Sequence, residues 1–99
     1  MSAYFILEIH PDIKDQAIDE YLACISADMT FHGGRVRSPG GKVQPVQGNR
    51  QMNRLLIIEF RTASIAREWY EEARQANEGV ARYRSLFACP AVIVAGMDG

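Results

Sequence analysis

His32 is the residue best suited to chemistry, because a histidine can act as a general base or hold an anion near neutral pH. The pair at 33–34 is Gly-Gly, and Arg35 follows directly, so that His32 and Arg35 together could hold a small anion. The alternative is structural, since a histidine at the C-terminal end of a helix satisfies free carbonyls and suits the helix dipole. His32 is therefore a candidate catalytic residue, but no acidic partner lies nearby in the sequence.

The other candidates lie on stretches with helical spacing. Arg82 and Arg84 flank a tyrosine, and either arginine could clamp a carboxylate in a pocket or simply pair with Glu71 or Glu78 at the surface. Three aromatic residues could line an apolar cavity with their polar tips or be plain core. The predicted ligand-binding residues are His32, Arg35, Arg82, Trp69, Tyr70 and Tyr21.

Several other chemistries lack the residues that they need. The two Gly-Gly pairs lack the context of a phosphate-binding loop, and no Ser-His-Asp or Cys-His order is present. Cys24 and Cys89 do not form a metal-binding spacing with His10 and His32, so we expect no metal and no cofactor. Two cysteines are also too few for a disulfide scaffold, which favours a reduced, cytoplasmic protein.

Hydrophobic periodicity predicts the elements of the N-terminal half. Residues 4–10 alternate as a strand, and Asp12 is a good N-cap for an amphipathic helix of about 17 residues that ends at the Gly-Gly pair. Two short extended pieces, 35–37 and 43–46, are predicted on either side of a Ser-Pro-Gly-Gly turn.

The C-terminal half has a clearer pattern. Residues 54–60 predict a central strand, and Thr62 or Ser64 is expected to cap the helix that follows. Residues 80–87 again have helical spacing, and residues 91–95 predict a final buried strand.

The resulting order, β-α-β-β-α-β, predicts one α+β domain over residues 1–99 with the ferredoxin-like arrangement. In that arrangement an antiparallel four-stranded sheet carries both helices on one face. The other face would expose Tyr4, Ile6, Leu55, Ile57 and one side of 91–95. An apolar patch of this kind favours a partner, so we expect a homodimer packed through the sheet face.

Charge and composition limit the choice of partners. The net charge is −1, but residues 1–30 have −5, residues 31–61 have +5 and residues 62–99 have −1. The near-neutral total argues against binding nucleic acid or an anionic membrane, and no apolar run is long enough to span a bilayer. The basic segment is either a solvated loop or a rim that attracts a small anion. Glu8 and Glu59 would lie on the open sheet face, where we expect partners such as Arg54 or His10.

Short motifs in a fixed order run from Tyr4 to Gly96. They are Ala3-Tyr4-Phe5, Glu20-Tyr21, His32-Gly33-Gly34-Arg35, Gly40-Gly41-Lys42-Val43, Gly48, Arg54 before Leu55-Leu56-Ile57-Ile58-Glu59-Phe60, Ala66, Trp69-Tyr70, Arg82 and Gly96. This pattern resembles the domain-of-unknown-function 1330 family, in the dimeric α/β-barrel group of ferredoxin-like domains. The resemblance implies a small cytoplasmic homodimer with a pocket between helices and sheet and no assigned activity.

Two features depart from that family. Pro39 precedes the central Gly-Gly where the family has arginine, and the stretch after Tyr70 lacks the family's Ser-x-Glu-Tyr. A ligand contact made by either feature in the family would need other residues here. Three functions remain open. The first is binding of a small anionic or aromatic molecule in the helix–sheet pocket. The second is a cofactor-independent monooxygenase- or isomerase-like enzyme that uses His32. The third is a purely structural dimerisation module.

Overall fold

The computed structural model describes residues 2–48, 53–77 and 79–96. Its elements are β1 (Ala3–Ile9), α1 (Asp15–Phe31), β2 (Arg35–Gly41), β3 (Arg54–Phe60), α2 (Ala63–Asn77), the 3-10 helix η1 (Ala81–Tyr83), α3 (Arg84–Phe87) and β4 (Ala91–Ala95). The predicted order of strands and helices is confirmed.

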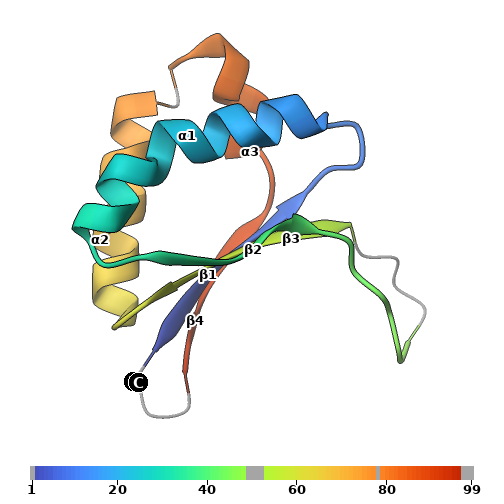
Figure 1. The fold of residues 1–99 in the computed structure, drawn as a ribbon, viewed down its shortest axis with the longest axis horizontal. Helices are drawn as coiled ribbons and strands as arrows, with labels where there is room; N and C mark the ends of the chain where they lie inside the picture. The colour runs from blue at the N-terminus through green and yellow to red at the C-terminus, as the bar shows by residue number, and fades with distance from the viewer. Residues whose placement is uncertain (1, 49–52, 78, 97–99) are drawn as a thin grey trace.

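The four strands form one antiparallel sheet in the order β2-β3-β1-β4. Figure 1 shows α1 and α2 on the same side of this sheet, and no helix of the described residues covers the opposite side. This topology is the predicted ferredoxin-like fold, in which each β-α-β crossover brings its helix to the same face.

The core lies between the helices and the sheet. The helix-facing residues of β1 and β3 are buried, and they alternate with half-buried residues that face the other way. The buried strand residues are Ala3, Phe5, Leu7, Ile9, Leu56, Ile58 and Phe60, and the buried residues of the two long helices are Ile18, Tyr21, Ile25, Met29, Ala66, Trp69 and Ala73. Each of the two long helices therefore buries one face against the sheet.

The N-terminal cap of α1 differs from the prediction. Asp12 does not cap the helix, because residues 10–13 first form a turn in which the N–H of Ile13 donates to the carbonyl of His10 at 3.1 Å. Lys14 takes the N-cap position without a side-chain hydrogen bond, and the helix begins at Asp15. For α2 the prediction holds, since the Thr62 hydroxyl accepts a hydrogen bond from the N–H of Ile65 at 3.1 Å.

The prediction of two short extended pieces after α1 is wrong. A single strand, β2, runs through the Ser-Pro-Gly-Gly stretch, and no strand follows at 43–46. Two shifts of register absorb the irregular residues, and the hydroxyl of Ser38 donates to the carbonyl of Leu55 at 2.9 Å. Pro39 is tolerated because β2 lies at the edge of the sheet, where a missing N–H costs little.

The final strand is in place but is not buried within the single chain. Four of the five residues of β4 are exposed, and Val92 and Val94 have 57% and 45% of their surface accessible. The reason is that β4 pairs only with β1 and forms the other edge of the sheet.

The two glycines that follow α1 end the helix in different ways. The N–H of Gly33 donates to Thr30 and that of Gly34 to Met29, which is the Schellman arrangement of a helix C-terminus. Gly33 has a φ of 75°, and a Cβ added there would meet open space. A Cβ on Gly34 would lie 2.6 Å from Met29 and 2.7 Å from Phe60. Gly33 is thus needed for its backbone conformation, and Gly34 for its lack of a side chain.

Substitutions at these two glycines should follow opposite orders of stability. Gly33→Ala should cost about 1–2 kcal/mol and Gly33→Asn less, because asparagine adopts the left-handed conformation more readily. At Gly34 the larger side chain should cost more, so that Gly34→Asn is less stable than Gly34→Ala. Urea unfolding of the four variants measures both comparisons. The same order at both positions would contradict this assignment.

Candidate functional site

His32 has a partner on each of its ring nitrogens. Its Nδ1 lies 2.8 Å from the carbonyl oxygen of Asp28 in the last turn of α1, which is the contact that the structural alternative predicts. Its Nε2 lies 3.3 Å from a carboxylate oxygen of Glu72 on α2. The acidic partner that the local sequence lacks therefore comes from the other long helix.

The remaining predicted ligand residues lie in different environments. Trp69 and Tyr21 belong to the core, and burial raises the pKa of Tyr21 above its ordinary value. The indole N–H of Trp69 is buried and has no hydrogen-bond partner within the described residues. Arg82 lies in η1, but its side chain is outside the described part of the chain.

Tyr70 lines a groove of about 320 Å³ between α2 and the β1–β4 edge of the sheet. The residues around this groove are Phe5, Arg67, Tyr70, Glu71, Cys89, Ala91, Val92 and Ile93. The rings of Phe5 and Tyr70 are stacked, with centroids 5.6 Å apart and planes inclined by 29°. The groove thus has an aromatic wall, and it lies between a helix and the sheet, where a pocket was expected.

The charged residues of this groove differ in their pairing. Glu71 accepts a hydrogen bond from Arg74 at 3.2 Å, so its charge is compensated. Arg67 is exposed and has no ion-pair partner among the described residues. The Cys89 thiol donates to the carbonyl of Ser85 at 3.3 Å. Arg67 is therefore the cation that the groove offers to an anionic ligand.

A second cavity, of about 270 Å³, gathers part of the basic central segment. Its lining residues are Ser2, Gly33, Arg35, Arg37, Glu59, Phe60 and Arg61. Among the predicted ligand residues whose side chains are described, only Arg35 lines it, and only Tyr70 lines the α2–β4 groove. The structure does not bring these predicted residues into one pocket.

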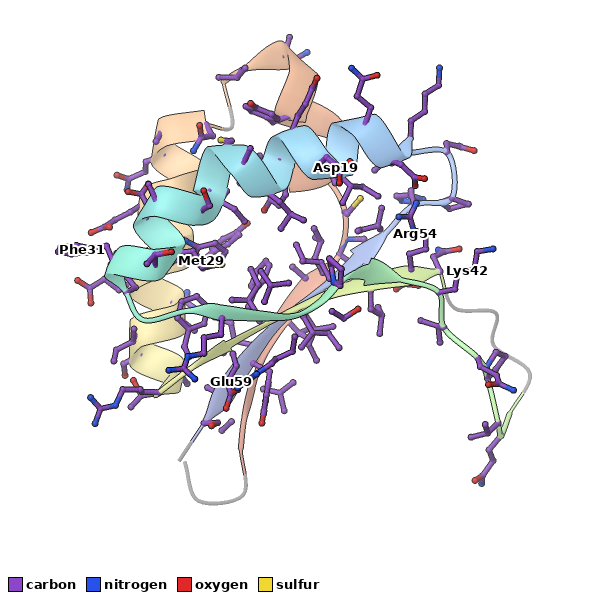
Figure 2. All side chains as sticks on the ribbon, in the orientation of Figure 1. Asp19, Met29, Phe31, Lys42, Arg54 and Glu59 are labelled. Carbon is purple, nitrogen blue, oxygen red and sulfur yellow. The ribbon has the colours of Figure 1, made fainter. Side chains whose placement is uncertain are left out.

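Glu59 lies on the sheet face away from the helices (Figure 2). Its carboxylate accepts hydrogen bonds from the Ser2 hydroxyl and from Arg37 Nε, the latter at 2.7 Å. These two bonds, the Ser2 bond above all, lower the pKa of Glu59. The prediction that Arg54 pairs with Glu59 is wrong. Arg54 instead donates hydrogen bonds to the carbonyl of Gly40 and to the carboxylate of Asp15.

Together these features define a small ferredoxin-like domain with a ligand-sized groove beside its second long helix. The chain belongs to the family described as "Domain of unknown function (DUF1330)", which matches residues 2–97. No curated protein matches the chain. None of the helices in the described part of the chain is long and apolar enough to cross a membrane.

Solved structures with a similar fold also lack an assigned function. A protein of unknown function from Rhodopseudomonas palustris, a structural genomics target, is 12% identical with a TM-score of 0.58, and the match covers 97% of this chain and 82% of that one. A methylated form of that protein is 14% identical with a TM-score of 0.56, over 97% and 81% of the two chains. A dimeric protein of unknown function with a ferredoxin-like fold from Bacteroides fragilis is 13% identical, over 96% and 94%, with a TM-score of 0.45.

The lowered pKa of Glu59 predicts how its two hydrogen bonds respond to pH. The stability that they contribute is present above the ordinary pKa of glutamate and is lost as the pH falls through the lower pKa of the folded state. Ser2→Ala should therefore raise the pKa of Glu59, as followed by carbon NMR of its carboxyl group. Ser26→Ala, an exposed serine on α1, is the control and should leave that pKa unchanged. An unchanged pKa in Ser2→Ala would contradict the assignment.

Proposed function

We propose that the chain binds a small aromatic carboxylate in the groove between α2 and β4. The observation that carries this proposal is the combination of a stacked aromatic pair with an arginine that has no ion-pair partner among the described residues. A volume of about 320 Å³ lies within the range of small-molecule sites.

Each part of the groove would recognise one part of such a ligand. The half-buried Tyr70, whose ring stacks on the buried Phe5, offers an aromatic surface against which a ligand ring can pack. The Arg67 guanidinium can bind both oxygens of a carboxylate in a fork, which fixes the orientation of the ligand. Tyr70 is a ligand-binding residue predicted from the sequence that also belongs to this proposed site. Arg67 belongs to the site but was not among the predicted residues.

The test is a thermal-shift screen of benzoate and related aromatic acids, followed by calorimetry of each compound that stabilises the protein. Arg67→Gln should weaken binding about tenfold or more, because a charge-assisted bidentate contact is lost. Arg35→Gln, with the same change of charge at the second cavity, should bind as the wild type does. Equal binding by wild type and Arg67→Gln, or loss in Arg35→Gln alone, would contradict this site.

The enzymatic alternative depends on His32 acting as acid or base. His32 lines neither the α2–β4 groove nor the second cavity, which favours a binding function over proton transfer by this residue. The purely structural alternative predicts that no aromatic acid binds specifically. The free thiols of Cys24 and Cys89 support the proposal of a reducing, cytoplasmic location.

We also propose that two copies of the chain form a homodimer through the open face of the sheet. Ile6 pairs with Ile57 on one side and with Val92 on the other, so that these three apolar side chains form a row across the uncovered face. Val92 is more than half exposed in the single chain. A second copy packed sheet to sheet would remove this row from water, which is favourable.

Substitution at the centre of this row tests the homodimer. Ile6→Lys places a charge where the partner's sheet would pack, so the molar mass from light scattering should fall from that of a dimer to that of a monomer. Phe31→Lys is the matched control, because Phe31 is 86% exposed at the end of α1 and points away from the sheet (Figure 2). A wild type that is monomeric at micromolar concentration would contradict the proposal.

A further inference from the structure

Three side chains of types that can bind a metal meet where the C-terminal end of α1 packs beside α2. His32 comes from the end of α1, and Glu68 and Glu72 lie one turn apart on α2. One histidine nitrogen and one oxygen of each carboxylate all lie within 4.8 Å of one another. The sequence predicts no metal site here, because the three residues lie in two distant segments.

The hydrogen bond of His32 determines which ring nitrogen is available. Nδ1 lies 2.8 Å from the carbonyl oxygen of Asp28, and a carbonyl can only accept, so Nδ1 carries a proton. In the neutral ring the lone pair is then on Nε2, the nitrogen that faces Glu72. A backbone carbonyl that holds the other ring N–H is the usual support of a metal-binding histidine.

The separation of Nε2 and Glu72 fits a shared cation. These two atoms lie 3.3 Å apart, which is longer than the 2.7–2.9 Å typical of a hydrogen bond between oppositely charged groups. Two ligands each about 2.1 Å from one zinc-sized ion are about 3.0–3.4 Å apart for octahedral to tetrahedral angles. The two acceptors are thus at the spacing of neighbouring metal ligands.

The surroundings of the cluster also favour an added positive charge. Glu68 and Glu72 are four residues apart on one helix face, where two like charges repel each other. The side chain of His32 is only 8% exposed and is therefore well ordered by packing, whereas that of Glu72 is 55% exposed. An ion can reach the site from solvent and find one fixed nitrogen ligand.

We propose that His32, Glu68 and Glu72 bind a divalent transition-metal ion of the zinc class. One imidazole nitrogen and two carboxylate oxygens suit such ions, and three protein ligands leave a coordination position for water or a small ligand. This site is separate from the α2–β4 groove, since none of its three residues lines that groove.

The test is calorimetric titration of the purified, chelator-treated full chain with Zn²⁺. We expect one ion per chain, and NMR of the histidine ring should show zinc shifting Nε2 of His32 while Nδ1 keeps its proton. Glu68→Gln and Glu72→Gln should each weaken zinc binding about tenfold or more, since each removes one charged ligand. Both residues are exposed, so these variants should fold normally.

Two control variants separate this site from other zinc-binding groups. Glu71→Gln makes the same change on the same helix outside the cluster, and His10→Gln removes the other histidine. Both should bind zinc as the wild type does. Zinc affinity unchanged in Glu68→Gln and Glu72→Gln, or no binding at about millimolar Zn²⁺, would overturn the proposal.

Discussion

The two long helices cover only one face of the sheet. The core, the groove and the open sheet face all follow from this constraint. Right-handed crossovers bring α1 and α2 to the same side, so that one side of β1 and β3 forms the core and the other side meets water. Because β4 lies at the edge, α2 packs beside it without burying it, and a groove remains between them. The same arrangement leaves Ile6 and Ile57 on the open face, where the proposed homodimer would pack.

Charged residues join parts of the chain that are distant in sequence. Arg54 on β3 links the carbonyl of Gly40 on β2 to Asp15 in the first turn of α1, where a negative charge also suits the helix dipole. His32 at the other end of the same helix faces Glu72 on α2. The near-neutral total charge thus conceals the Arg54–Asp15 pair, which joins the sheet to the first helix.

Much of the fold could be predicted because its signals are local. Alternation of apolar residues marks β1 and β3, and a period near 3.6 marks the core faces of α1 and α2. The prediction of a turn was wrong because strand pairing outweighed the local preference of the residues for a turn. The stretch around Pro39 has the composition of a turn, but hydrogen bonding to β3 holds it as an irregular edge strand. The site was less predictable, since only Tyr70 lines the proposed groove among the expected residues whose side chains the structure describes.

The sequence by itself determined the order of the elements, the faces that enter the core and the apolar character of the second sheet face. These follow from the spacing of residues along a regular backbone, which is set by helix and strand geometry. Only the tertiary structure decided the partners of the charged groups: Glu72 for His32, Arg37 for Glu59, and no ion-pair partner within the described residues for Arg67. Such pairings depend on strand register and helix packing, which bring together side chains that no local pattern relates.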